Sequence, residues 1–198
     1  MEAIEKERTR LVLLGEELKR IPKVRVILAL GLLKMKKMDL VVQKATELGA
    51  HAIYPLLTGR TIAKIENKQD KKMERWNRIV LEAAKQSGST PVPEVHPPEE
   101  LKRFIAGGGE SKKMFLSERG GETLRDILMS PLNEKREIPG SVILLVGPEG
   151  GWTEEEEQDI MNNSFEAVSL GTFTLRSETA AIVSLAMVSH FWMHEDVS

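Results

Sequence analysis

Two hydrophobic patterns alternate along the chain. In one, apolar residues follow one another, as in buried strands; in the other, they recur every three or four positions, as on one face of a helix. The strand-like runs lie at residues 24–30, 52–57, 113–117, 141–146 and 167–170. The helical patterns lie at residues 38–48, 70–86, 99–105 and 122–129, from residue 153 onward, and from about residue 178 to 194. This order predicts the α/β class, with a mainly parallel sheet and helices on both faces.

Glycine and proline mark the ends of several elements. Gly49 ends the first helical pattern, and the breakers within residues 88–98 predict a connection with room for a short strand at 93–95. Residues 131–139 predict a polar loop. Residues 1–22 fit the pattern poorly, apart from one stray strand-like run at 10–14. We therefore expect residues 23–198 to form one domain and residues 1–22 to be a linker or a remnant of another.

Composition excludes several classes of site. The 198 residues include no cysteine, which excludes disulfides, thiolate metal sites and cysteine nucleophiles. The N-terminus is charged and lacks the apolar segment of a secretory signal. The longest apolar run, residues 179–193, is shorter than the roughly 20 residues that span a bilayer. We expect a cytoplasmic protein without a membrane partner.

The net charge of −2 hides an asymmetry between the two halves of the chain. Residues 1–90 hold 19 Lys and Arg against 11 Asp and Glu, and the remainder is acidic. One helical pattern in the basic half carries five cations on the face opposite its apolar residues: Lys71, Lys72, Arg75, Arg78 and Lys85. Such a face is either a solvated surface or a surface for the RNA backbone.

The sharpest local motif runs from Leu145 to Gly151, LVGPEGG, where a buried strand ends in a glycine-rich turn. Thr153 and Glu156 have the spacing of a capping box and predict a helix start. Glycines let a ligand approach the backbone at the carboxyl end of a strand, although such a turn is also common without a ligand. The glutamates at 154–157 already fill the helix N-terminus, so a phosphate is disfavoured and an uncharged or cationic cofactor fits better.

Three further motifs are less specific by themselves. Residues 170–180, LGTFTLRSETA, join a strand to the apolar last helix, with Ser177 as the predicted N-cap and Arg176 in need of a partner. QKATELG and EAAKQSG close two helical patterns with polar residues that are usually solvated. His190 and His194 have a spacing that can bind a metal, but no third ligand accompanies them, so we predict no metal site.

Taken together, QKATELG, EAAKQSG, GPEGG and LRSETA occur in an order and spacing that resembles the RsmE family, the 16S ribosomal RNA (uracil-N3)-methyltransferases of the SPOUT class. The resemblance covers roughly residues 24–195. It implies a SPOUT-type fold with a C-terminal trefoil knot, S-adenosylmethionine as the methyl donor, 16S rRNA in the small ribosomal subunit as substrate, and a homodimer. It also implies that residues 1–22 are the remnant of an N-terminal PUA-like RNA-binding domain. The chain departs from the family at Ser89 and Phe173, where arginine is common.

The resemblance also assigns residues. It places the cofactor among three loops, with these predicted binding residues: Leu116, Ser117, Glu118, Leu145, Gly147, Pro148, Glu149, Gly150, Gly151, Leu170, Gly171, Leu175, Arg176, Thr179 and Ala180. Uracil N3 must lose a proton, so a base or a stabiliser of the anion is needed. We expect Arg176 to stabilise that charge or to orient RNA phosphate, and Glu178 to accept the proton or to hold Arg176. The RNA surface is assigned to the five cations of residues 71–85.

Two alternatives to a uracil-N3 methyltransferase remain open. One is a non-catalytic RNA-binding or ribosome-assembly module of the same fold. The other is a SPOUT ribose 2′-O-methyltransferase, although the N-x-G-x-x-x-R pattern of that branch is not found in the chain. Methylation of ribosomal RNA separates the first alternative from the enzyme, and the chemical position of the methyl group separates the second.

Overall fold

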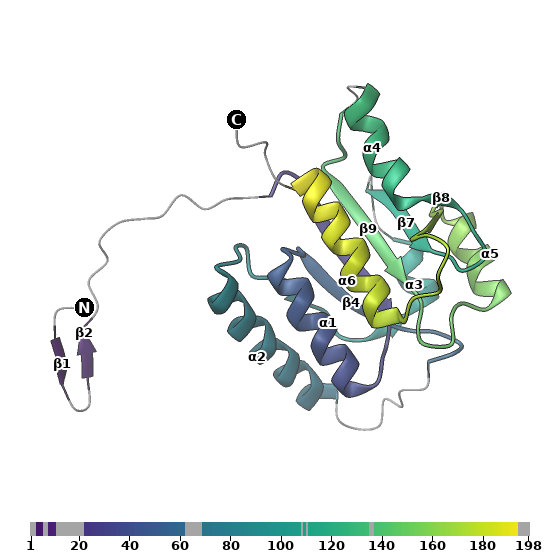
Figure 1. Ribbon diagram of the computed structural model, residues 1–198. Helices are drawn as coiled ribbons and strands as arrows, with labels where there is room; N and C mark the ends of the chain where they lie inside the picture. The colour runs from purple at the N-terminus through teal and green to yellow at the C-terminus, as the bar shows by residue number, and fades with distance from the viewer. Residues whose placement is uncertain are drawn as a thin grey trace.

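A computed structural model of the chain describes residues 3–5, 8–10, 22–61, 69–107, 109, 111–134 and 137–193. Its main sheet has eight strands, and every pairing in that sheet is parallel. The strand order is β5-β4-β3-β9-β7-β10-β8, with β6 paired to β4 (Figure 1). The predicted parallel α/β sheet is therefore confirmed.

The elements follow the hydrophobic pattern closely. The strands of the sheet are β3 (Arg25–Gly31), β4 (Ala52–Leu57), β5 (Glu94–Val95), β6 (Glu99–Glu100), β7 (Lys112–Leu116), β8 (Glu122–Thr123), β9 (Ser141–Val146) and β10 (Glu166–Ser169). The helices are α1 (Met35–Glu47), α2 (Gln69–Ser87), α3 (Leu101–Ile105), α4 (Leu124–Glu134), α5 (Glu154–Asn162), α6 (Ser177–Val188) and the short π-helix η1 (Ser189–Met193). Two further strands, β1 (Ala3–Glu5) and β2 (Arg8–Arg10), pair antiparallel.

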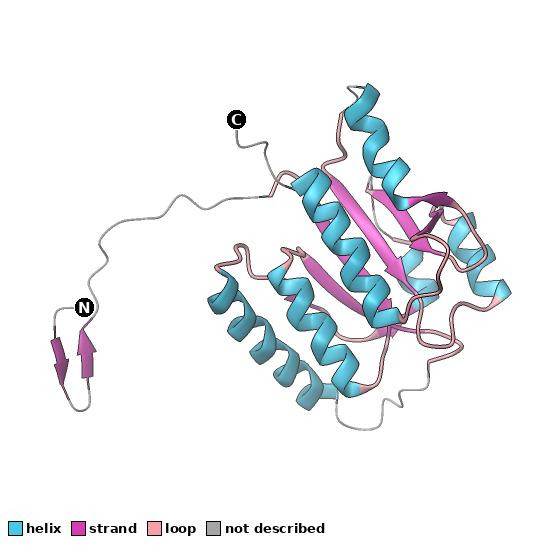
Figure 2. Cartoon of the chain, viewed as in Figure 1, coloured by secondary structure: helices cyan, strands magenta, loops and turns pink. Residues whose placement is uncertain are grey.

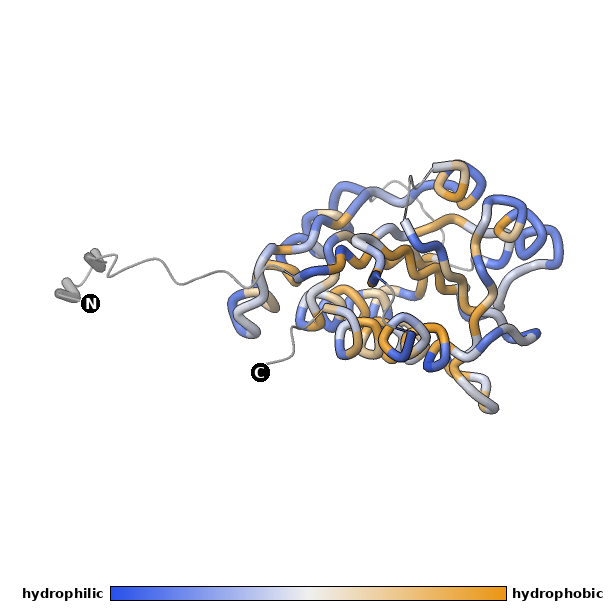
Figure 3. Tube along the Cα trace, turned by 90° about the horizontal axis from the view of Figure 1, so that it is seen from above, coloured by the Kyte–Doolittle hydropathy of each residue, from blue (hydrophilic) through white to orange (hydrophobic). Residues whose placement is uncertain are grey.

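Helices cover both faces of the sheet, as predicted (Figure 2). The larger core joins one face to α1, α2, α4 and α6, and the smaller core joins the other face to α3 and α5. Figure 3 shows the hydrophobic residues gathered along the sheet and the inner sides of the helices. The central strands are buried on both faces, which explains why β9 reads as a continuous apolar run.

Several predicted boundaries are wrong. The helical patterns predicted from residues 99 and 122 each begin with a two-residue strand, β6 or β8, so α3 starts at Leu101 and α4 at Leu124. Residues 131–134 continue α4 rather than opening a loop, so Pro131 lies inside the helix near its end, where its missing N–H removes a single backbone bond. The N-cap of α6 is Arg176, in extended conformation and without a side-chain cap, and Ser177 is already helical. The predicted stray strand falls largely outside the described residues, since only Arg10 of residues 10–14 is described.

The last helix changes from an α-helix to a π-helix after Val188. Its residues 189–193 form η1, and the indole nitrogen of Trp192 there donates a 2.9 Å hydrogen bond to the backbone oxygen of Leu128 in α4. His194 lies outside the described residues. Among the described helices, none is both long enough and apolar enough to cross a membrane.

Candidate functional site

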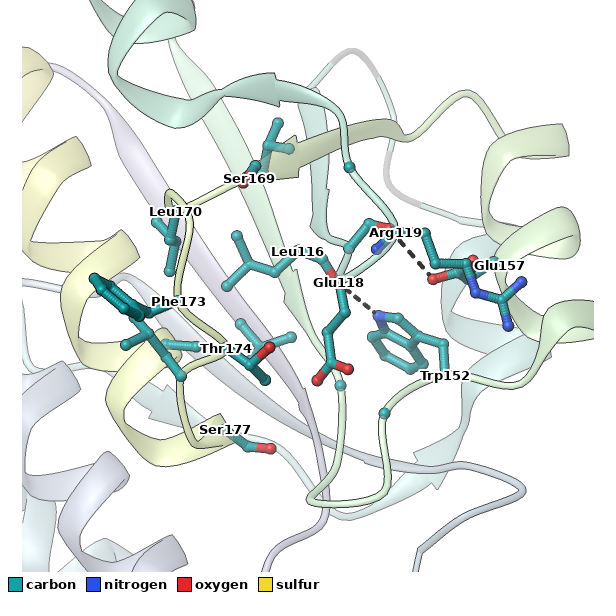
Figure 4. Close-up of a pocket in the computed structure, with 18 of the residues that line it drawn as sticks. Leu116, Glu118, Arg119, Trp152, Glu157, Ser169, Leu170, Phe173, Thr174 and Ser177 are labelled. Atoms are coloured by element: carbon teal, nitrogen blue, oxygen red, sulfur yellow. Dashed lines mark hydrogen bonds and ion pairs between the residues drawn. The ribbon is translucent and has the colours of Figure 1, made fainter.

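A cavity lies at the carboxyl ends of three neighbouring strands, β9, β7 and β10. It measures about 470 Å³, a size that suits a small-molecule ligand. Its walls are the loops that follow these strands and the first turns of α5 and α6 (Figure 4). Arg60, from the segment after β4, also lines it. Because the sheet is parallel, all these loops meet at one edge, where α/β folds bind ligands.

The turn after β9, residues 147–151, is packed closely against β3. A Cβ added to Gly31, at the end of β3, would lie 2.6 Å from the backbone nitrogen of Pro148, so no larger residue fits there without displacing the turn. Gly151 has φ of +67°, a backbone conformation that other residues rarely adopt. The turn therefore requires glycine both in itself and in the strand beneath it.

The capping box predicted at the start of α5 is confirmed, and it has a second role. The Thr153 hydroxyl accepts a bond from Glu156 N at 3.1 Å, and Thr153 N donates to Glu156 Oε2 at 2.9 Å. The other carboxylate oxygen of Glu156 accepts a 2.7 Å bond from Gly59 N. One buried carboxylate thus satisfies donors at the helix start and anchors the loop that contains Arg60.

Arg60 lines the cavity, although it lies in a segment of the chain without a recognisable motif. Its guanidinium Nη1 donates a 2.8 Å bond to the backbone oxygen of Gly150, and the side chain lines the cavity. The two residues are 90 positions apart. No local motif surrounds Arg60, so only the fold could identify it as a residue of the site.

Two of the cavity loops are joined by Trp152. Its indole nitrogen donates a 3.0 Å bond to the backbone oxygen of Leu116, which ends β7 (Figure 4). Trp152 is almost fully buried from solvent and still forms part of the cavity wall. Its position immediately after GPEGG was the only signal that could have included it in the predicted site.

Charged groups in the cavity are both acidic and basic. Arg119 forms ion pairs with Glu157 at 3.4 Å and with Glu154 at 3.3 Å, and the Ser117 hydroxyl donates to Glu157 at 3.3 Å. Glu118 extends its carboxylate toward the middle of the cavity (Figure 4). The pair of Glu157 with Arg119 offsets one negative charge, whereas Glu118 has no ion pair among the described residues and suits a cationic group of a ligand.

Most of the predicted cofactor residues meet at this cavity. Those that line it are Leu116, Ser117, Glu118, Gly147, Pro148, Gly151, Leu170, Gly171, Leu175 and Ala180. The structure places five others off its wall: Leu145, Glu149, Gly150, Arg176 and Thr179. Leu145 is enclosed in the smaller core, and Thr179 is exposed on α6. The lining residues that the sequence reasoning missed are Arg60, Arg119, Gly120, Val146, Trp152, Glu157, Val168, Ser169, Thr172, Phe173, Thr174 and Ser177.

Of the two roles predicted for Glu178, the contact with Arg176 is not formed. Glu178 is 9% exposed, and its carboxylate Oε2 lies 3.3 Å from the Nζ atom of Lys37, which also lies 3.2 Å from Glu149 Oε1. In the described part of the chain Glu178 therefore pairs with Lys37 rather than with Arg176. Arg176 is exposed, between two residues that line the cavity, Leu175 and Ser177.

The predicted RNA-binding cations lie on α2, at the outer edge of the helix layer beyond α1 (Figure 1). Lys71, Arg78 and Lys85 are exposed, and Lys72 is half-buried. Arg75 donates through Nη2 to Asp39 of α1 at 2.7 Å, a contact that raises the pKa of Arg75. Lys71, Arg78 and Lys85 thus present positive charge outward, whereas Arg75 is held by Asp39.

A metal site is not indicated. The described residues contain no group of three or more His, Asp or Glu side chains arranged to hold a metal ion. Of the two histidines that the sequence spacing brings together, His190 is exposed, and His194 lies outside the described residues.

Comparison with known proteins identifies a family over most of the chain. The family model described as "RNA methyltransferase domain" matches residues 19–189. The ribosomal RNA small subunit methyltransferase E of Synechocystis is 36% identical over 166 residues, covering 83% of this chain and 52% of that protein. Its counterpart in Mesomycoplasma hyopneumoniae is 33% identical, covering 83% and 69%. The chain thus spans about half to two thirds of the length of these relatives.

Solved structures agree with the fold. A ribosomal RNA small subunit methyltransferase E from Neisseria gonorrhoeae bound to S-adenosyl methionine matches with a TM-score of 0.79 at 32% identity, covering 89% of this chain and 70% of that one. A putative methyltransferase of Legionella pneumophila in complex with the same cofactor also has a TM-score of 0.79, at 34% identity, covering 88% and 69%. A SpoU methyltransferase of Streptomyces viridochromogenes, at 15% identity and a TM-score of 0.53, covers 85% of this chain and 60% of that one and shares the fold alone. These neighbours confirm the SPOUT-type fold.

Proposed function

Since this chain belongs to the RNA methyltransferase domain family, and within it to the ribosomal RNA small subunit methyltransferases E, we propose that it methylates N3 of a specific uridine in 16S rRNA of the small ribosomal subunit, with S-adenosylmethionine as donor. One observation carries the proposal. Ten residues predicted from the family resemblance, drawn from three separate segments of the chain, line one cavity at the carboxyl edge of the sheet.

The cavity fits the cofactor by the chemistry of its walls. Leu116, Leu170 and Leu175 supply apolar surface for a flat ring, and the loop backbones supply hydrogen-bonding groups for its edge. The free carboxylate of Glu118 suits a ligand with positive charge, whereas a phosphate would meet Glu118 and the glutamates at the start of α5. When bound, S-adenosylmethionine supplies a methyl group on a positively charged sulfur.

The chain itself mainly positions the two reactants and stabilises the charge that develops when the uracil N3 proton passes to water. When the methyl donor and the uracil are held in line, the transfer takes place within one complex and needs no further encounter of two molecules. In this proposal Arg176, which is exposed between the cavity residues Leu175 and Ser177, stabilises negative charge on the uracil as its N3 proton leaves. Glu178 pairs with Lys37 and lies off the cavity wall, so its proposed role is to position the loops rather than to accept the proton.

The proposal includes two partners. The exposed cations of α2, Lys71, Arg78 and Lys85, provide a surface for RNA phosphates. The outer side of α6 exposes part of Ile182, Val183 and Ala186, an apolar strip suited to the same helix of a second copy. We also propose the trefoil knot for the C-terminal part, residues 23–198 as the methyltransferase domain, and residues 1–22 as the remnant of a PUA-like domain.

Two measurements test the proposal in sequence. Calorimetry determines whether the purified chain binds S-adenosylmethionine, and labelled cofactor then determines whether methyl groups enter the RNA of undermethylated small ribosomal subunits. We expect both binding and transfer. Binding without transfer to any ribosomal RNA contradicts the proposed enzyme and favours the non-catalytic RNA-binding alternative.

A further inference from the structure

Lys37 joins three elements that are distant in sequence. It lies in the first turn of α1, and its ammonium Nζ lies 3.2 Å from Glu149 Oε1 and 3.3 Å from Glu178 Oε2. Glu149 belongs to the turn after β9, and Glu178 to the first turn of α6. One lysine thus ties the two segments to each other through their carboxylates.

The two carboxylates depend on Lys37 for their charge balance. Glu149 Oε1 and Glu178 Oε2 are both buried and make no hydrogen bond within the described residues, so the ammonium is the group that compensates them. Both oxygens lie within 3.3 Å of the same nitrogen, close enough to repel each other if it were removed. Conversely, Glu149 and then Glu178 raise the pKa of Lys37, so it is protonated at neutral pH.

The cluster lies directly behind the cavity wall. Pro148 and Gly151, on either side of Glu149, line the cavity, and so do Ser177 and Ala180, on either side of Glu178. Lys37 itself does not line it. The opposite side of the same turn is held by Arg60, which donates to Gly150 O. The turn is therefore fixed from two directions, by Arg60 within the cavity and by Lys37 outside it.

We propose that Lys37 is a positioning residue for the cofactor, which preforms the cavity by drawing the Glu149 turn and the start of α6 together. This inference deepens the proposed function and rests on it. Without the ammonium, two buried carboxylates repel each other and the turn separates from α6, so that the loops must be reordered when the cofactor binds. The free energy of this reordering opposes binding, so the affinity for the cofactor falls.

The test compares Lys37→Met with Lys37→Arg and with a matched control, Lys36→Met, which removes an exposed neighbouring lysine. Calorimetry gives the Kd for S-adenosylmethionine, and thermal unfolding without ligand reports folding. We expect Lys37→Met to weaken binding by about tenfold, Lys37→Arg to restore it to within about threefold, and Lys36→Met to leave it unchanged. In methyl-transfer assays, we expect KM for the cofactor to rise in Lys37→Met while kcat changes less.

A second variant distinguishes charge balance from simple loss of packing. The double variant Lys37→Met with Glu178→Gln removes one of the two repelling carboxylates, so it binds the cofactor more tightly than Lys37→Met alone. If Lys37→Met does not fold, the single variant Glu178→Gln is measured instead. It removes the ion pair between α6 and Lys37, while Lys37 still balances the charge of Glu149. We then expect the Kd for S-adenosylmethionine to rise about threefold or more.

The outcomes separate this inference from the proposed function. A folded Lys37→Met that binds the cofactor as tightly as the wild type overturns the inference alone, and so does a double variant that binds no better than Lys37→Met. A wild-type chain that binds no S-adenosylmethionine overturns the proposed function and this inference with it. The wild-type chain could also bind the cofactor without methylating RNA, while Lys37→Met binds it more weakly. That result contradicts the proposed enzymatic activity but supports the role of Lys37.

Discussion

The indole nitrogen of Trp152 donates a 3.0 Å hydrogen bond to the backbone oxygen of Leu116. The two residues follow or end neighbouring strands, β9 and β7, and both line the cavity (Figure 4). This bond fixes the separation of two of the three loops that surround the proposed cofactor. The shape of the site therefore depends on a side chain that no motif includes.

Replacement of that indole tests its importance. We expect Trp152→Phe to lower the free energy of unfolding by about 1 kcal/mol, since a hydrogen bond is lost, and to weaken cofactor binding several-fold. The matched control is Trp76→Phe, because the Trp76 indole nitrogen is buried without a hydrogen-bond partner in the described structure. Denaturant unfolding and calorimetry provide the measurements. Equal losses of stability in the two variants would show that ring volume, rather than the bond, is what matters.

The carboxylate of Glu156 supports both the start of α5 and the loop of Arg60. Glu156→Ala removes the acceptor for Thr153 N and for Gly59 N, so we expect unfolding to become easier by about 1–2 kcal/mol. Glu155→Ala, in the same turn but paired with Lys102 at the surface, should cost less than about 1 kcal/mol. Denaturant midpoints of the two variants that coincide would contradict a special role for Glu156.

Arg60 is the residue of the site that the fold alone identifies. Since its guanidinium holds Gly150 O and faces the cavity, we expect Arg60→Ala to raise the Kd for S-adenosylmethionine by about tenfold. Arg125→Ala, which removes an exposed arginine of α4, is the control and should not change the Kd. Unchanged affinity in Arg60→Ala would place the arginine outside the binding site.

Arg176 is proposed to act on the transition state rather than on cofactor binding. At saturating cofactor, we expect Arg176→Ala to lower methyl transfer by about a hundredfold, with little change in the Kd for the cofactor, because charge on the uracil develops only during the reaction. The rate of methyl transfer to small ribosomal subunits is measured for both proteins. A near-normal rate in Arg176→Ala would show that Arg176 has no role in the mechanism.

The apolar strip of α6 makes a prediction about assembly. We expect Val183→Glu to convert a homodimer into a monomer, because the strip would then bury a charge without a partner. Leu81→Glu, on the exposed face of α2, should leave the dimer intact. Analytical ultracentrifugation distinguishes the outcomes, and a wild-type chain that sediments as a monomer would contradict the proposed interface.

The fold was largely predictable because buried parallel strands and amphipathic helices leave distinct periods in the sequence. The run at residues 141–146 and the capping box at Thr153 and Glu156 were located to the residue. The errors came from tertiary context. Pro131 lies within the last turns of α4, where the sequence predicts a loop. Arg176 is the N-cap of α6, although serine, the residue type at 177, is usually preferred at that position.

The cavity was predictable only where motifs mark it. The glycine-rich turn and the loop after β10 carry recognisable sequences, and their residues lie together as expected. Arg60 and Lys37 carry none, because each acts through a partner about a hundred positions away in the chain. A contact of Glu178 with Arg176, one of the two roles expected for Glu178, is not found for the same reason, since the partner of Glu178 comes from α1.

The identity of the methylated nucleoside distinguishes a uracil-N3 methyltransferase from every alternative. Small ribosomal subunits from cells that lack this modification are incubated with the chain and labelled S-adenosylmethionine, and the RNA is then digested to nucleosides for mass spectrometry. We expect labelled 3-methyluridine, which disappears when the cofactor is omitted. Labelled 2′-O-methyl nucleosides without 3-methyluridine, or no labelled nucleoside at all, would contradict the proposed function.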